Sequence, residues 1–392
     1  MSLSVFWDPA GECTELEPMP ETWETWLAQS NEPLEDERRI LLHQVEEALS
    51  LKIIRMETLA ADGNLVVAVE YENGHQDVVR SPRPNRREGE QHSISVQRFW
   101  REINLLKWLK EVSSLQVPSI RAIIEPQNPE RCPYVVMDKM PGSVLMNVAG
   151  RMPYEAKERL MYSHAEVFLQ LFRLKVPQRI GTLCVHEPGG LLDIVPWQAI
   201  GSERSAARVY DTLEQFVDGL IESRRQSGDI GTDEAARLRG EEVLARLAEK
   251  LSPICKRLSR PSLRRCVLVH DDLNQTNILS NESGEITGVI DWEYQSVRPA
   301  VLAAKYPGCI RYDGINDPQY ASGDEWWTVS PGDARKLREL YAQIVKDRDY
   351  EYWEALVEGE TLRQAVEWLS SPGSDEGCVL LEQWMDTVYP RD

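Results

Sequence analysis

Residues 267–293 read VLVHDDLNQTNILSNESGEITGVIDWE. Two short apolar runs, NIL and GVI, flank the turn-rich segment NESGE, a pattern that predicts a β-hairpin. Carboxylates beside apolar residues are costly to bury unless they have partners. The hairpin nevertheless carries a set of polar side chains at its edges: His270, Asp271, Asp272, Asn274, Asn277 and Asp291. The sequence therefore raises the question of what these side chains do together.

The spacing of the polar residues suits phosphoryl transfer. This chemistry needs a carboxylate that accepts the proton of an attacking hydroxyl, and oxygen ligands for the magnesium ions that bridge the phosphates. Asp272 and Asn277, five positions apart on one loop, are able to face one cavity, and Asp291 on the far strand is able to reach the same ions. Few protein ligands leave positions for phosphate oxygens and water. The alternative is an ordinary polar hairpin whose Asp and Asn side chains cap turns.

The strings HDDLNQTNIL and VIDWE resemble the catalytic loop and metal-binding segment of the aminoglycoside phosphotransferase-like (choline-kinase-like) family, fungal type, of the protein-kinase-like superfamily. The resemblance implies Asp272 as the catalytic base, with His270 bracing the loop. It implies Asn277 and Asp291 as metal ligands, and ATP and Mg²⁺ as cofactors. It also implies an α+β fold with two lobes: a small N-terminal antiparallel sheet with one long helix, and a larger, mainly helical C-terminal lobe.

The first half of the chain has further parts that resemble this family. Gly63 and Asn64, in the ADGN turn, resemble the family's turn over the phosphates. Arg80 ends the third predicted strand, and Glu102 lies on the following helix. The resemblance implies that these residues bind the nucleotide and that Arg80 pairs with Glu102.

The connector CPYVVMDKMPGSVL resembles the hinge between the two lobes. There the resemblance implies that Asp138 to Met140 offer backbone groups to the adenine ring. The chain departs from the family pattern at two positions. Arg80 stands where lysine is usual, and arginine is bulkier and aimed differently. Asp271 stands where many relatives have glycine, and its carboxylate either repels phosphate or points to solvent.

Three regions are expected along the chain. Residues 1–34 form an N-terminal arm, which its prolines keep irregular and whose tryptophans pack onto the body. Residues 35–138 form a nucleotide-binding lobe with five strands and one helix inserted after the third strand. Residues 139–392 form the lobe that carries the catalytic loop and the substrate pocket.

The bulk composition sets limits on partners and location. The 392 residues carry a net charge of −20, which argues against nucleic acid and anionic membranes as partners. No run of 18 apolar residues occurs, and the first residues lack a secretory signal, so a cytoplasmic protein is expected. Seven cysteines without a CxxC pair indicate free thiols rather than disulfides or a zinc site.

We interpret the chain as a kinase that acts on a hydroxyl of a small molecule. A nucleotide-binding pseudokinase that acts as a scaffold is an alternative, because Arg80 is unusual. A protein kinase is less favoured, since only seven residues separate Asp291 from Pro299, too few for a peptide-holding activation segment. The oligomeric state is not indicated by the sequence.

The charge of the acceptor is left open by the sequence. Five acids follow the IDW string and would favour a cationic acceptor by attraction; these are Glu293, Asp313, Asp317, Asp324 and Glu325. Aromatic neighbours would add cation–π attraction; these are Tyr294, Tyr312, Trp326 and Trp327. The alternative is that the acids are solvated loop residues. The string EWW at 325–327 is either a wall on which the substrate stacks or ordinary packing.

Overall fold

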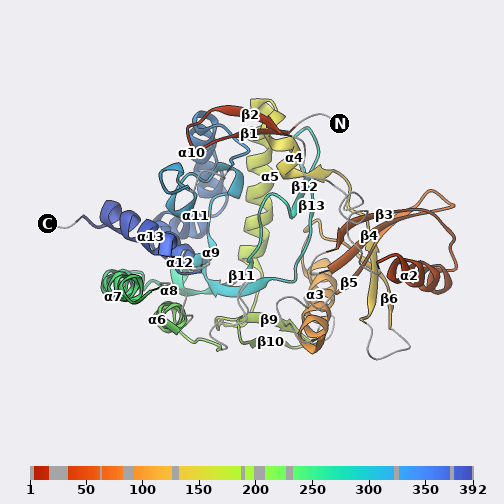
Figure 1. The fold of residues 1–392 in the computed structure, drawn as a ribbon, viewed down its shortest axis with the longest axis horizontal. Helices are drawn as coiled ribbons and strands as arrows, with labels where there is room; N and C mark the ends of the chain where they lie inside the picture. Colours follow the sequence, from red (N-terminus) through yellow and green to blue (C-terminus); the bar gives the residue numbers. More distant parts are fainter. Residues whose placement is uncertain are drawn as a thin grey trace.

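The molecule has two parts, and the first part along the chain after the N-terminal strands is built on a five-stranded antiparallel sheet between residues 53 and 138 (Figure 1). The computed structural model describes residues 4–16, 34–61, 64–82, 92–125, 132–186, 190–197, 208–226, 233–321, 326–370 and 375–390. The strand order is β3-β4-β5-β7-β6, and the strands are β3 (Ile53–Ala61), β4 (Asn64–Tyr71), β5 (Gln76–Pro82), β6 (Ile120–Ile124) and β7 (Tyr134–Asp138). The predicted sheet, with one helix inserted after its third strand, is confirmed.

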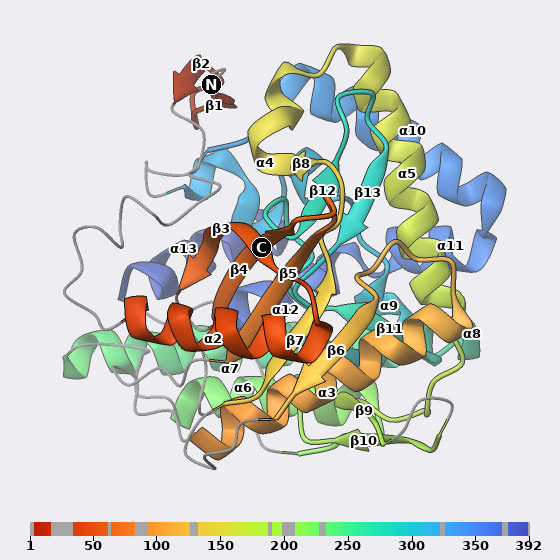
Figure 2. The same ribbon diagram turned by 90° about the vertical axis from the view of Figure 1, so that its right-hand side faces the viewer.

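Each face of this sheet packs on one helix. Side chains alternate across a strand, so Tyr134 and Val136 of β7 join the cluster that includes Leu41 and Val45 of α2 (Leu34–Leu49). The intervening residues of β7 pack against Phe99 and Ile103 of α3 (His92–Val112). Figure 2 shows α2 lying across the outer face of the sheet. The inner helix α3 therefore sits between the sheet and the rest of the molecule.

The helix α3 belongs to two cores at once. Its middle, around Phe99 and Ile103, packs on the sheet, whereas Leu105, Leu106 and Leu109 enter the large core of the second part. Glu102 lies between these two groups and is 4% exposed. The sequence thus places a carboxylate where the two parts of the chain meet.

The second part is mainly helical around α5, which carries an apolar stripe into the large core. Its longer helices are α5 (Tyr154–Arg173), α6 (Leu213–Gln226), α7 (Glu234–Arg257), α10 (Pro331–Arg348), α11 (Tyr350–Glu358), α12 (Glu360–Ser370) and α13 (Asp375–Val388). Its short helices are α4 (Leu145–Val148), α8 (Pro261–Arg264) and α9 (Ala300–Ala303). The expected α+β architecture, with a small sheet part and a larger helical part, is confirmed.

Local signals explain where several of these helices begin. Asp233 caps α7 by accepting a hydrogen bond from the Ala236 N–H. Ser330 caps α10 by accepting from the Asp333 N–H, and Pro331 occupies the first turn, where no N–H is needed. Asp349 both ends α10 and caps α11. Capping residues therefore define the starts of three helices of the second part.

Small sheets frame the segment from His270 to Asp291. The three-stranded sheet is β13-β12-β8, and two pairs of strands are β11-β14 and β9-β10. The strands are β8 (Ser143–Val144), β9 (Thr182–Val185), β10 (Leu192–Val195), β11 (Cys266–His270), β12 (Ile278–Ser280), β13 (Ile286–Val289) and β14 (Gln295–Pro299). The hairpin predicted for residues 277–293 is therefore present as β12 and β13.

The expectation of an irregular N-terminal arm is wrong for residues 4–16. These residues form the antiparallel ribbon of β1 (Ser4–Trp7) and β2 (Cys13–Leu16). The turn closes because Asp8 accepts a hydrogen bond from the Glu12 N–H, and Gly11 adopts a positive φ of 80°. Trp7 exchanges two backbone hydrogen bonds with Trp327, at 2.8 and 2.9 Å, so the ribbon packs on the helical part as expected. Trp23 and Trp26 lie outside the described residues.

Two further observations bear on the class of protein. All seven cysteines are free, and four of them are buried: Cys255, Cys266, Cys309 and Cys378. Among the described residues, no helix has both the length and the apolar composition needed to cross a bilayer.

Candidate active site

The segment from His270 to Asp291, which carries the candidate site residues, is held at both ends by strand pairing. His270 ends β11 and lies opposite Gln295 of β14, so the chain before Asp272 and the chain after Asp291 run side by side. Between them, β12 and β13 form the hairpin, whose turn contains Gly284 with a φ of 88°. A side chain at Gly284 would collide with the carbonyl of Ala156 on α5. The hairpin therefore packs directly on the central helix.

Asn277 and Asn274 hold the Asp272 carboxylate from both sides. The Asn277 Nδ2 donates to Asp272 Oδ2 at 2.8 Å and to the Asp272 carbonyl at 2.9 Å. The Asn274 Nδ2 donates to Asp272 Oδ1 at 2.8 Å, and Asn274 is itself fixed by a hydrogen bond from the Thr276 N–H. Burial raises the pKa of Asp272, while His270 and the two amides act in the opposite direction. The carboxylate is thus held in one orientation. The sequence analysis counted Asn274 among the polar side chains of the hairpin but assigned it no role, although its Asn-x-Thr pattern is typical of an Asx turn.

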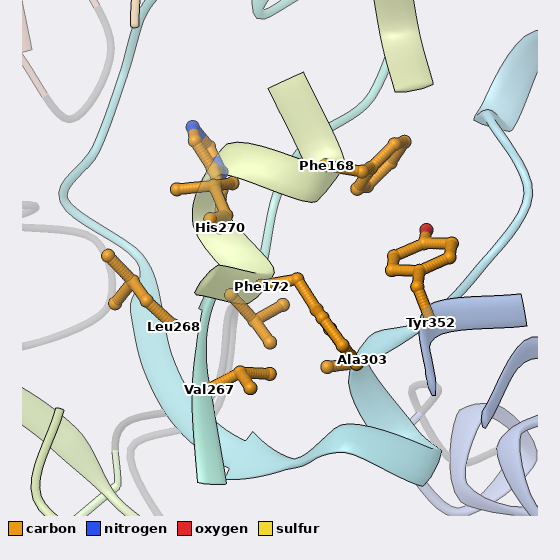
Figure 3. Close-up of a pocket in the computed structure, with 9 residues that line it drawn as sticks. Phe168, Phe172, Val267, Leu268, His270, Ala303 and Tyr352 are labelled. Atoms are coloured by element: carbon orange, nitrogen blue, oxygen red, sulfur yellow. The ribbon is translucent and has the colours of Figure 1, made fainter. Parts of the chain in front are cut away.

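His270 connects the loop that carries Asp272 to the segment that carries Asp291. Its Nε2 lies 3.0 Å from the Ile290 carbonyl, which only accepts, so this nitrogen carries the proton. The ring packs on Trp292 with 4.6 Å between centroids, and burial lowers the pKa of His270, which favours the neutral form. Figure 3 shows the histidine beside a small pocket lined mostly by apolar side chains, among them Phe168 and Phe172. The contacts of His270 support a bracing role.

A single guanidinium joins three carboxylates where the two parts meet. The Arg80 Nη1 donates to Glu102 Oε1 at 2.5 Å. Its Nη2 donates to Asp291 Oδ1 at 2.9 Å and to Glu293 Oε2 at 3.0 Å. The expected pairing of Arg80 with Glu102 is therefore present. Glu293 was considered from the sequence only as an acid near the acceptor, and its contact with Arg80 was missed.

The charges of this cluster shift several pKa values. Burial alone would lower the pKa of Arg80, but Glu102, Asp291 and Glu293 together raise it. Burial raises the pKa of Glu102 to about 7, with Arg80 opposing the shift. Burial also raises the pKa of Glu293. Arg80 opposes these shifts at both acids, and Arg98 also opposes the shift at Glu293.

Backbone contacts fix the Asp291 loop. The Trp292 N–H donates to Glu102 Oε1 at 3.0 Å, so the helix α3 holds the loop directly. Asp291 has a φ of 63°, a left-handed conformation that is uncommon outside glycine. Such a residue persists only where the surroundings determine its conformation. Here the Arg80 ion pair and the Trp292–Glu102 hydrogen bond supply that restraint.

The remaining predicted nucleotide residues lie around this cluster. Asn64, at the start of β4, donates through Nδ2 to Glu293 Oε2 at 3.1 Å. Gly63 lies outside the described residues. The Asp138 N–H donates to the Ser119 carbonyl at 3.1 Å. That N–H is therefore occupied by the protein. Met140, two residues beyond the end of β7, packs against Gly288 of β13.

The expectation that Asp271 points to solvent is wrong, and the structure pairs its carboxylate with a cation. Its Oδ1 accepts from Ser296 Oγ at 2.7 Å and forms an ion pair with Arg298 at 2.9 Å. Its Oδ2 accepts from Trp197 Nε1 at 3.1 Å. The carboxylate is 5% exposed, so it neither points to solvent nor lacks a compensating charge. Asp271 joins β11 to β14, because antiparallel pairing brings residues 296 and 298 beside it.

The acids expected to attract a cationic acceptor have partners within the protein. Asp313 is bonded to Arg311 and Arg338, each at 3.0 Å, and Glu293 is bonded to Arg80. Asp317 caps a short helix by accepting from the Gln319 N–H. Asp324 and Glu325 lie outside the described residues. The described acids therefore give little support for a cationic acceptor.

Comparisons with known proteins agree with this geometry. A model of the phosphotransferase enzyme family matches residues 58–301. The clavilactone A biosynthesis cluster protein Y of Ampulloclitocybe clavipes is 40% identical over 382 residues, which are 97% of this chain and 94% of that protein.

Two solved structures share the fold. The apo form of a thermostable mutant of the aminoglycoside phosphotransferase APH(4)-Ia aligns with a TM-score of 0.50 at 14% identity, over 89% of this chain and 100% of that one. A further mutant of that enzyme was solved in a ternary complex with AMP-PNP and hygromycin B. It aligns with a TM-score of 0.50 at 14% identity, over 89% of this chain and 99% of that one. At this identity the likeness shows the fold alone, and the expected protein-kinase-like fold is confirmed.

Proposed function

Because this chain belongs to the phosphotransferase enzyme family, we propose that it transfers the γ-phosphoryl group of ATP to a hydroxyl of a small molecule. One observation carries this proposal. The Asp272 carboxylate is held by Asn277 at 2.8 Å on the loop that also leads to Asp291. A fixed carboxylate beside two oxygen ligands is the arrangement that phosphoryl transfer to an alcohol requires.

Asp272 is the proposed base. It orients the acceptor hydroxyl and takes its proton as the oxygen attacks phosphorus. Asn277 and Asn274 hold the carboxylate so that little reorientation is needed. His270 keeps this loop against the carbonyl of Ile290, the residue before Asp291.

The residues fit a magnesium site of few protein ligands. The Asn277 amide nitrogen is directed to Asp272, which leaves its Oδ1 as a possible ligand. The Asp291 carboxylate is 35% exposed and bonded to Arg80 only through Oδ1. Among the described residues there is no group of three His, Cys, Asp or Glu side chains placed to hold a metal, which suits an ion that takes its other ligands from phosphate and water. Bound Mg²⁺ would neutralise the negative charge of the phosphates.

The nucleotide site is proposed to lie along Asn64, Arg80, Glu102 and the segment from Asp138 to Met140, with Gly63 in the turn over the phosphates. AMP-PNP in the complex of the structural neighbour supports a nucleotide here. Arg80 has two donor groups in a planar fork, which suits phosphate oxygens. We also propose residues 1–34 as the arm, 35–138 as the nucleotide-binding lobe and 139–392 as the catalytic lobe.

The test is ADP release from the full chain with ATP and magnesium over a library of hydroxylated metabolites and aminoglycosides. Phosphorylation of one acceptor, lost in Asp272→Asn, is the expected result. If ATP binds but no acceptor is phosphorylated, the pseudokinase alternative is preferred. Phosphorylation of serine or threonine peptides, with none of small alcohols, would instead favour a protein kinase.

A further inference from the structure

Gln275 is held by two segments that lie far from it in the sequence. Its carbonyl accepts a hydrogen bond from the Met146 N–H of α4 at 3.1 Å. Its side-chain Oε1 accepts from Thr328 Oγ1 at 3.0 Å, and Thr328 is fully buried. Gln275 lies between Asp272, the proposed base, and Asn277, a proposed magnesium ligand. It therefore anchors the loop of residues 272–277 to the rest of the second part.

The two neighbours of Gln275 connect it to the Asp272 carboxylate. Asn274 donates through Nδ2 to Asp272 Oδ1 and through its N–H to the Asp272 carbonyl, each at 2.8 Å. The Thr276 N–H donates to Asn274 Oδ1 at 2.8 Å and closes the turn. Because rigid peptide planes join Gln275 to both neighbours, a shift of Gln275 is expected to move them as well. The orientation of the Asp272 carboxylate thus depends on where Gln275 is held.

The N-terminal ribbon of β1 and β2 contacts both segments that hold Gln275. Trp7 exchanges two backbone hydrogen bonds with Trp327, at 2.8 and 2.9 Å. Trp327 is 7% exposed and its ring stacks on Tyr312 at 5.4 Å between centroids, so this ring of the EWW string is packing. Trp327 directly precedes Thr328. The ribbon therefore fixes the backbone from which Thr328 reaches Gln275.

The second segment is α4 with the turn η1 (Ala149–Arg151) that follows it. Figure 1 shows β1 beside α4. Ser4 Oγ donates to the Asn147 carbonyl at 3.3 Å. Gly150 lies so close to β1 that an added Cβ would collide with the Val5 carbonyl oxygen. The ribbon is thus in direct contact with the helix whose N–H holds the Gln275 carbonyl.

We propose that Gln275 is a positioning residue for Asp272, and that the ribbon of residues 4–16 sets its position through Met146 and Thr328. This inference rests on the proposed function, because it assigns a role beside the proposed base. Small misplacements of a group that acts on the substrate lower the rate strongly. Loss of the anchor should therefore lower kcat and leave the KM for ATP unchanged, since the anchoring contacts involve none of the proposed nucleotide-binding residues.

The test compares Thr328→Val, which removes the donor and keeps the shape, with Thr328→Ser, which keeps the donor. In the full chain with ATP, magnesium and the acceptor found by the screen, Thr328→Val should lower kcat about tenfold with the KM for ATP unchanged. Thr328→Ser should restore most of kcat. Parental kcat in Thr328→Val, or equal losses in the two variants, would overturn the role of Gln275.

A pair of glycine variants tests the ribbon. Gly150→Ala places a methyl group against the Val5 carbonyl, which displaces the ribbon from α4, and it should lower kcat as Thr328→Val does. Gly308→Ala is the matched control and should keep the parental kcat, because an added Cβ there meets nothing within 4 Å. Parental kcat in Gly150→Ala would overturn the role of the ribbon.

Amide hydrogen exchange tests the anchor without any acceptor. The N–H groups of Asn274, Thr276 and Asn277 are bonded within the loop. Thr328→Val should speed their exchange roughly fivefold, the effect of losing one hydrogen bond, with β4 unchanged and with parental exchange in Thr328→Ser. If this pattern is found and yet no acceptor is phosphorylated by the parent, the anchor stands and phosphoryl transfer fails. If acceptors are phosphorylated equally well by Thr328→Val, the kinase stands and the anchor is wrong.

Discussion

Arg80 donates to Asp291 at 2.9 Å although the two residues lie in different parts of the molecule and 211 positions apart. The same guanidinium holds Glu102 and Glu293. The ion pair therefore links the sheet to the segment proposed to bind metal. A nucleotide whose phosphates approach Arg80 must share this guanidinium with the carboxylates, so binding and the position of Asp291 are expected to be coupled.

Asp291→Asn should remove the thermal stabilisation that magnesium-ATP gives to the parent. A ligand that binds only the native state raises Tm, and loss of the carboxylate weakens the metal site. Asparagine is chosen because it tolerates the left-handed backbone at this position. Glu282→Gln, on the exposed turn of the same hairpin, is the control and should keep the full shift. Identical parental melting curves with and without magnesium-ATP would count against the site altogether.

Asp272→Asn should lower turnover by roughly 100-fold or more while leaving the fold and nucleotide affinity nearly unchanged. The amide keeps the size of the side chain and an oxygen that accepts from Asn277, but it is not a base. Steady-state kinetics on the acceptor found by the screen give the comparison. A variant with parental turnover would require a different base.

Arg80→Ala should destabilise the fold by about 3–5 kcal/mol, because Glu102 and Glu293 would remain buried without their cation. Urea unfolding measures the loss. Adding Glu102→Gln to Arg80→Ala should recover part of it, since one uncompensated charge is then removed. Arg80→Lys should retain part of both stability and ATP binding, because it keeps the charge but not the fork. Unchanged stability in Arg80→Ala would show that the cluster is not a structural unit.

His164 should make the fold sensitive to acid. The side chain is 2% exposed within α5, and burial lowers its pKa from 6.5 to about 4. Below pH 6.5 the unfolded chain binds a proton at His164, whereas the native chain does not bind it until the pH approaches 4. The free energy of unfolding is therefore highest above pH 6.5 and falls as the pH is lowered toward 4. The loss is up to about 3 kcal/mol. The variant His164→Gln does not titrate, and its unfolding free energy should fall less than that of the parent between pH 7.5 and 4.5. Parallel pH curves for the two proteins would contradict this assignment.

Local patterns predicted the helices, the five-stranded sheet and the hairpin, because these depend on periodicity and turn residues. The Arg80–Glu102 pair was also predictable, since it follows from the order of strand and helix. Glu293 and Asp271 were misjudged because their partners are set by tertiary packing. Asn64 meets Glu293 across 229 positions, and Asp271 meets Arg298 only because β11 pairs with β14. No local pattern encodes such partners.

The β1–β2 ribbon has a consequence for how the chain is assembled. Trp7 and its backbone partner, Trp327, are separated by about 320 positions in the sequence. The ribbon therefore has no backbone partner until residue 327 has been synthesised and placed, and the contact closes a loop of about 320 residues, whose entropy cost grows only slowly with length. Docking of the ribbon is thus expected to be a late event in folding. A fusion partner placed before Ser4 is therefore expected to disturb the docking of the ribbon rather than the formation of either core.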